Sequence, residues 1–249
     1  MKMKRIVFLL LSIAMLGMWG CNDEPGENIQ LGESVAILGY SSELQEYTLL
    51  IPGVSGMPAQ ILLAPELSTI ILTNSNISLG DAVLAVFHIN FDQQPTPGYT
   101  TVINLGIFPI ETSEPWRTYG SGSSGFDTPI VSMDDFENQP YCEIIKHQGK
   151  IVFFFLFWHT VTPSENIAFY YEMTYDIDED AAIQSAYIRA KVTNEGSVGE
   201  QMTGFNHHAF DMTYFFQELE EYSKTTFRIF YNEGGEEESF KLLKEFEIE

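Results

Sequence analysis

The chain has 249 residues, 45% hydrophobic and 14% aromatic, so it is long enough for about two domains with a sizeable core. Acidic residues outnumber basic ones by 35 to 12, and the formal net charge is −23. Nucleic-acid binding depends on lysine and arginine neutralising phosphates, and the sequence has no basic cluster, so no nucleic-acid partner is expected. The excess of acids is typical of a solvated, soluble surface.

Residues 1–20 have the order of regions of a secretory signal peptide. A basic start, residues 1–5, precedes an apolar run from Ile6 to Met18. This run is shorter than the roughly 20 apolar residues of a membrane-spanning helix. With Cys21 directly after Gly20, the segment resembles a bacterial lipoprotein signal, which is cleaved before the cysteine and acylated on it. We predict lipidation of Cys21; an ordinary signal peptide with an unmodified cysteine is the alternative.

Lipidation would decide the location of the protein. Each buried methylene of an acyl chain contributes about 0.8 kcal/mol, so several chains anchor a protein firmly in a membrane. Asp23 and Glu24 resemble the acidic export signals of some Bacteroidetes lipoproteins. The expectation is a lipid anchor in the bacterial outer membrane, possible surface exposure, and a polar tether over residues 21–33. Without residues 1–20, nine bases and 35 acids remain, and the net charge becomes −26.

An acylated Cys21 would leave Cys142 as the single other cysteine, so no intramolecular disulfide is expected. A catalytic cysteine needs a neighbouring base and a lowered pKa. Cys142 instead precedes a long apolar stretch, residues 151–158, which favours a buried structural thiol.

Residues 34–110 are predicted to form five or six β-strands linked by hairpin loops. Their segments are rich in branched and aromatic residues and are bounded by turn formers. They cover residues 34–40, 46–52, 59–65, 68–74, 82–91 and 98–108. This number of strands in about 75 residues is compatible with a small barrel of the OB type, although the periodicity alone does not separate it from a small sandwich.

Residues 111–128 interrupt the strand pattern with glycine and serine and are predicted to be a linker or loop. Gly120, Gly122 and Gly125 match the G-x-G-x-x-G pattern of dinucleotide-binding proteins. That motif requires a helix after the last glycine, whereas an extended segment with Pro129 follows here. A loop is therefore favoured over a nucleotide site, and no cofactor is expected.

Residues 129–249 are predicted to form an antiparallel β-sandwich with one short helix. Six strand-like segments cover residues 150–159, 166–176, 185–194, 204–212, 225–232 and 239–249. The helix is placed after Asp211, because Tyr214 or Phe215, together with Glu218, Leu219 and Tyr222, lies near helical spacing. The fold class predicted for the whole chain is thus all-β.

The histidines form no metal-binding motif. They are His88, His147, His159, His207 and His208. The adjacent His207 and His208 would point to opposite faces of a strand, so they could bind one metal only if the stretch were a bulge or turn. Structural or solvated roles are favoured for all five, and no metal site is predicted from them.

Asp176, Asp178 and Asp180 have the spacing of the first ligands of a calcium loop. The glycine and the bidentate glutamate that an EF-hand requires are replaced by Ala181 and Tyr187, so the segment is not an EF-hand. A low-affinity calcium loop on the three aspartates stays an alternative to a charged loop between two strands.

No catalytic signature is present. The G-x-S-x-G motif is absent, and Ser121, Ser123 and Ser124 lie in the predicted linker. Pairs of carboxylates for glycoside cleavage cannot be identified among 35 acids by sequence. The aromatic residues 153–158 and 168–171 could stack on sugars, but strand alternation favours core packing for many of them.

The sequence as a whole resembles the NigD-like lipoproteins of Bacteroidetes. The likeness is carried by residues 79–111, residues 151–160, "FNHHAFD" at 205–211 before the short helix, and the closing segment 227–242. The resemblance implies an OB-like N-terminal part, a β-sandwich C-terminal part and a cell-envelope location. It implies no catalytic or binding residues.

Two functions from different classes follow. The first is a non-catalytic, lipid-anchored envelope protein that binds a protein, peptide or glycan. The second is an exported glycan-processing hydrolase or sugar-binding protein, with carboxylates brought together between the domains. The absence of a catalytic signature and the family resemblance favour the first.

Overall fold

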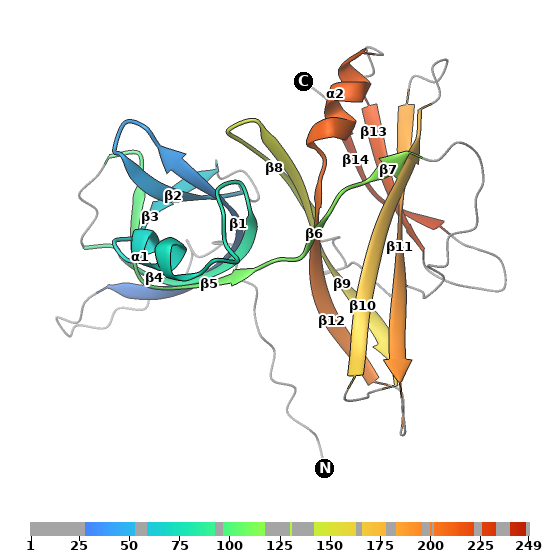
Figure 1. Ribbon diagram of the computed structural model, residues 1–249, viewed down its shortest axis with the longest axis horizontal. Coiled ribbons are helices and arrows are strands. Elements are labelled where there is room, and N and C mark those ends of the chain that lie inside the picture. Colours follow the sequence, from blue (N-terminus) through green and yellow to red (C-terminus); the bar gives the residue numbers. More distant parts are fainter. Residues whose placement is uncertain are drawn as a thin grey trace. The chain divides into compact units, whose positions relative to one another are not determined.

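A computed structural model describes two compact units, which divide after Ile110 (Figure 1). The described residues are 28–52, 59–92, 97–117, 130, 142–162, 166–177, 183–195, 200, 202–221, 226–232 and 240–247. Strands predominate in both units, so the all-β prediction is confirmed. No helix among these residues is long and apolar enough to cross a membrane.

The first unit is a closed barrel of five strands in the order β1-β2-β3-β5-β4. The strands are β1 (Ile29–Ser41), β2 (Glu46–Ile51), β3 (Gln60–Leu63), β4 (Ala82–Asn90) and β5 (Thr100–Pro109). All neighbours pair antiparallel except β3 and β5, whose parallel pairing completes the barrel. A five-stranded Greek-key barrel with a helix between its third and fourth strands is an OB fold, as expected from the sequence.

Two details of the barrel differ from the sequence-based expectation. The first strand begins at Ile29, which pairs with Asn90, so the last residues of the expected tether are strand. Residues 67–73 form the helix α1 (Leu67–Thr73) instead of a strand. Helical spacing places Leu67 and Ile71 together, and both pack against the barrel core. Burial of this pair outweighs the strand preference of the branched residues around it.

Gly32 permits the close approach of β1 to the Phe87 ring inside the barrel. A Cβ atom at residue 32 would lie 2.5 Å from Cε2 of Phe87, and that ring is fully buried. We expect Gly32→Ala to lower the free energy of unfolding of the barrel by about 1–3 kcal/mol, because the ring has to leave its position. Thermal unfolding followed by circular dichroism measures the loss.

The matched control is Gly106→Ala in β5, where the added Cβ would be 3.5 Å from the Phe108 ring, an ordinary contact. This change is expected to stay within about 0.5 kcal/mol of the wild type. Equal losses in the two variants would contradict the steric explanation.

The second unit is a sandwich of two sheets. The five-stranded sheet has the order β14 (Phe240–Glu247), β13 (Thr226–Asn232), β11 (Ile183–Glu195), β10 (Asn166–Asp176) and β7 (Trp116–Arg117). The four-stranded sheet has the order β6 (Thr112–Ser113), β12 (Met202–Asp211), β9 (Lys150–Val161) and β8 (Cys142–His147). Phenylalanines dominate the core between the sheets, among them Phe153, Phe155, Phe157, Phe210 and Phe227.

The sheets are mixed rather than purely antiparallel. β13 pairs parallel to β11 because the chain passes through β12 of the other sheet and the helix α2 (Thr213–Glu221) before it returns. β6 and β7 also pair parallel, with β12 and β10 respectively. β6 and β7 are therefore edge strands within the segment predicted as a linker, and the glycines at 120, 122 and 125 lie outside the described residues.

The helix predicted after Asp211 is confirmed as α2. The Asp211 carboxylate accepts a hydrogen bond from the Thr213 backbone N–H at 3.0 Å, and Lys150 donates to its other oxygen at 2.5 Å. Burial alone would raise the pKa of Asp211, but these hydrogen bonds and the lysine charge lower it. Phe215 and Leu219 anchor the helix in the sandwich core.

Candidate functional site

Several residues singled out from the sequence lie outside the described residues. They are Cys21, Asp178 and Asp180, while Asp176 is the last residue of β10. Lipidation of Cys21 and the calcium loop therefore stay predictions. Within the described ranges, no group of three or more His, Cys, Asp or Glu side chains could hold a metal ion.

Cys142 lies on β8 with its side chain in the sandwich core. Burial raises the pKa of the thiol to about 12, and the charges of Lys244 and Glu143 have smaller, opposing effects. A thiol with this pKa is protonated at neutral pH and is a poor nucleophile. The geometry agrees with the structural role expected for Cys142.

His207 and His208 both lie in β12, so their side chains point to opposite faces of the sheet. His208 faces the core and is 1% exposed, whereas His207 is half-buried. Burial, and to a smaller extent the neighbouring His207, lower the pKa of His208 to about 3. The buried imidazole is therefore neutral at physiological pH.

A serine–histidine pair is present that the sequence did not indicate. The Ser113 hydroxyl of β6 is 3.0 Å from Nε2 of His208, in hydrogen-bond contact, although the two residues are 95 positions apart. The ring of Tyr171 on the facing sheet lies 4.8 Å from the imidazole, and its hydroxyl accepts a hydrogen bond from Asn206 at 3.2 Å. Burial raises the pKa of the Tyr171 phenol, so it stays protonated.

This pair does not have the geometry of a catalytic triad. In a triad, a carboxylate orients the histidine through Nδ1, and the histidine takes up the serine proton. Nδ1 of His208 is buried without a hydrogen-bond partner, and an imidazole with a pKa near 3 is a weak base. The contact instead attaches β6 to the sandwich core.

A second group of side chains covers the outer side of the five-stranded sheet, away from the sandwich core. Strand alternation places there the residues between the core positions of β10, β11 and β13. We call this surface the aromatic face and define it by Trp116, Tyr170, Glu172, Thr174, Tyr187, Arg189, Lys191, Arg228, Phe230 and Phe240.

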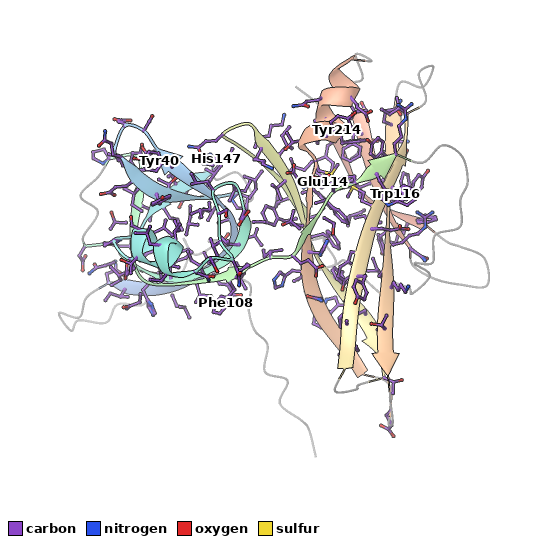
Figure 2. All side chains as sticks on the ribbon, in the orientation of Figure 1. Tyr40, Phe108, Glu114, Trp116, His147 and Tyr214 are labelled. Atoms are coloured by element: carbon purple, nitrogen blue, oxygen red, sulfur yellow. The ribbon has the colours of Figure 1, made fainter. Side chains whose placement is uncertain are left out.

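The edge strand β7 presents Trp116 on the aromatic face (Figure 2). Trp116 pairs with Thr174 of β10, and the following Arg117 therefore points to the opposite side of the sheet. There the Arg117 guanidinium lies 3.9 Å from the Glu218 carboxylate of α2, which also accepts a 2.6 Å hydrogen bond from Tyr175. These contacts hold β7 in place, while the Trp116 side chain stays 47% exposed.

Tyr170 is the second exposed aromatic residue of the face, at 46% exposure. It lies four residues before Thr174 on β10, so about 13 Å of strand separates it from the position beside Trp116. Further along the sheet, Tyr187 of β11 stacks on Phe230 of β13 with ring centroids 5.4 Å apart, and it meets Phe240 edge-on at 5.0 Å. The face thus has exposed aromatic rings at one edge and packed rings at its centre.

Glu172 lies between the two exposed rings and is 7% exposed. Its Oε1 atom is buried and has no hydrogen-bond partner. Arg189 is directly opposite Glu172 in the strand register, but its guanidinium donates to the Thr174 hydroxyl at 2.8 Å and lies 4.7 Å from the Phe240 ring. The carboxylate of Glu172 therefore keeps an unused acceptor between the strand positions of the two exposed rings.

The basic residues are distributed unevenly between the two units. From Asn22 to Trp116 the sequence contains no lysine or arginine, so the whole barrel lacks cationic side chains. OB barrels that bind oligonucleotides use such side chains to contact the phosphates, and this barrel lacks them. Three cations, Arg189, Lys191 and Arg228, lie instead on the aromatic face. The lack of basic residues in the barrel can be read from the sequence. That Arg189, Lys191 and Arg228 share one face cannot, because it depends on strand pairing.

An OB barrel followed by a β-sandwich with mixed sheets defines the structural class of the chain. No protein-family model matches it, and no curated protein matches its sequence. Solved structures do match. An uncharacterised protein from Parabacteroides merdae is 16% identical, with a TM-score of 0.56, over 86% of this chain and 95% of that chain. A "putative lipoprotein" from Bacteroides fragilis is also 16% identical, with a TM-score of 0.54, over 88% of this chain and 98% of that chain.

A NigD-like immunity protein from Bacteroides caccae is among the matching structures as well. It is 11% identical, with a TM-score of 0.42, over 86% of this chain and 91% of that chain. The similarity to the Parabacteroides merdae and Bacteroides fragilis proteins covers both parts of the fold, and not only the barrel or the sandwich.

Proposed function

We propose that this protein is a lipid-anchored protein of the bacterial cell envelope, of non-catalytic type, that binds a partner through the aromatic face. The observation that carries the binding role is the buried, unpartnered Oε1 of Glu172 between the exposed rings of Trp116 and Tyr170. An unpaired buried acceptor costs about 1–3 kcal/mol, and a ligand that donates to it recovers part of this cost. The alternative of a hydrolase gains no support from the Ser113–His208 pair.

The anchor is supported by the lipoprotein-like order of residues 1–21 and by the name of the Bacteroides fragilis neighbour. The acidic residues Asp23 and Glu24 favour the outer face of the outer membrane. With its anchor at residue 21, the chain would reach its ligand from the membrane surface.

Cys21→Ser is expected to abolish lipidation, because the serine hydroxyl cannot replace the thiol that is acylated. Cells grown with radiolabelled palmitate should give a labelled wild-type protein in the membrane fraction and an unlabelled variant that is unprocessed or released. The matched control is Cys142→Ser, which leaves the predicted lipidation site unchanged. An unlabelled, soluble wild-type protein would contradict the anchor. Protease treatment of intact cells reports which side of the outer membrane carries the protein.

Docking on the aromatic face can be tested in cells by replacing Tyr170 with a photoreactive amino acid and analysing the cross-links that form on illumination. Cross-links to an envelope component are expected from residue 170. The matched control is residue 214 on α2, where Tyr214 is also exposed but lies outside the aromatic face. Equal cross-linking from both sites, or none from residue 170, would contradict docking on this face.

A further inference from the structure

The chemistry of the aromatic face defines the class of its ligand, an inference that rests on the proposed binding role. A carboxylate oxygen only accepts hydrogen bonds, so Oε1 of Glu172 requires a donor from the ligand. Hydroxyl and N–H groups supply such donors, whereas carboxylates, sulfates and phosphates do not.

The two exposed rings set the second requirement. Trp116 and Tyr170 are each about half exposed on the same side of the sheet, on either side of Glu172. Large aromatic side chains expose apolar ring surface that is stabilised when it is covered. The ligand must therefore combine apolar surface with hydroxyl donors, and it must extend over the roughly 13 Å between the two positions. Linked sugar rings have C–H faces for the aromatic rings and hydroxyl edges for Glu172.

Charge is the third requirement. After removal of residues 1–20 the net charge is −26, which repels a polyanion at long range, and Glu172 repels it locally. A cationic peptide would instead meet Arg189 and Lys191 on the same face, where Arg228 is already paired with Glu245. A ligand without net charge avoids both penalties, and its hydroxyl oxygens can accept hydrogen bonds from the exposed Lys191.

We propose that the aromatic face binds a neutral glycan chain, with the rings of Trp116 and Tyr170 stacking on sugar units and the Glu172 carboxylate accepting a hydrogen bond from a sugar hydroxyl. The glycan extends along β10, so that at least two sugar units contact the protein. The site is a binding site only, and no bond is formed or broken in the ligand.

The test is affinity electrophoresis and titration calorimetry of the chain from residue 22, with a panel of neutral polysaccharides: glucan, mannan, galactan, arabinan and xylan. Polygalacturonate and a lysine-rich peptide are the charged comparisons. At least one neutral polysaccharide should bind, and both charged probes should bind at least tenfold more weakly. Trp116→Ala and Tyr170→Ala should each weaken binding by tenfold or more.

Glu172→Gln tests the carboxylate. The amide oxygen of glutamine is a weaker acceptor than a carboxylate, so affinity should fall severalfold while the shape is retained. Tyr214→Ala removes an even more exposed aromatic ring outside the face and should leave binding unchanged. Unfolding curves of all variants verify that the sandwich is intact.

The outcomes separate the ligand class from the binding role. Binding to none of the neutral polysaccharides, or stronger binding to a charged probe, would overturn the glycan proposal. If cross-linking from residue 170 then captures an envelope protein, docking on the aromatic face stands with a different partner. If cross-linking also fails, the proposed function fails with it.

Discussion

Replacing Phe155 with alanine is expected to lower the free energy of unfolding of the β-sandwich by about 3–5 kcal/mol. Phe155 is 1% exposed and lies at the centre of the aromatic core. Its ring stacks on Phe210 at 5.7 Å and meets Phe157 at 5.0 Å, and the Tyr171 ring of the facing sheet lies 6.1 Å away. Alanine would leave a cavity that these stiff rings cannot fill. The variant therefore loses the free energy gained by burying the ring and also bears the cost of the cavity.

Tryptophan fluorescence during urea unfolding measures this loss. In the chain from residue 22 the two tryptophans are Trp116 and Trp158, and both belong to the second unit. The signal therefore reports on the sandwich even if the barrel unfolds separately. The matched control is Phe230→Ala on the outer side of the five-stranded sheet, which removes a half-buried ring outside the core and should cost clearly less. A loss below about 1 kcal/mol for Phe155→Ala would contradict a close-packed core.

The phenylalanine core can be predicted from the sequence for a simple reason. Phe153, Phe155 and Phe157 alternate with other residues in one strand, and that alternation already assigns them to one face. The same local rule predicted α2, because Asp211 caps it and its apolar residues follow helical spacing. Features that depend only on residues close together in the sequence can therefore be predicted from it.

The errors arose where distant pairing decides the structure. The segment 67–73 contains branched residues that favour strands, but the barrel end offers a buried place for Leu67 and Ile71 on a helix. The strands β6 and β7 have two residues each and exist only because β12 and β10 offer free edges. No periodicity can develop in two residues, so the sequence suggested a linker there.

The candidate site was hidden for the same reason. Trp116, Glu172 and Arg189 are separated by up to 73 positions and come together through the pairing of β7, β10 and β11. In the sequence, Tyr170 belongs to the aromatic segment 168–171, which indicates core packing or stacking on sugars but no particular neighbours. The alternation of β10 predicts that Tyr170 and Glu172 share a face, but the neighbours on that face depend on the register.

The second large effect is expected from the pH dependence of His208. Its pKa is about 3 in the folded protein, because burial disfavours the charged imidazole, against an ordinary value of 6.5. Between pH 6.5 and pH 3 the unfolded chain therefore binds a proton that the folded chain does not bind. The free energy of unfolding falls as the pH falls through this window, by at most about 1.4 kcal/mol per pH unit.

Comparison of the wild type with His208→Gln isolates this contribution. Glutamine is neutral at every pH and can place a polar atom near the Nε2 position that contacts Ser113. Other titrating groups are common to both chains, so their effects cancel in the difference between the two unfolding free energies. From pH 6.5 to pH 5 the wild type should lose about 1.6 kcal/mol relative to the variant.

The matched control is His207→Gln, since His207 is half-buried on the opposite face of β12. Its pKa is also lowered by burial, but this imidazole is less enclosed than that of His208. The stability curve of His207→Gln should therefore follow the wild type much more closely than that of His208→Gln. A wild-type difference from His208→Gln that stays constant between pH 7 and pH 4 would show that His208 is accessible to protons. In that case the Ser113–His208 pair would have the basic imidazole that serine chemistry requires, and the non-catalytic proposal would lose its main structural support.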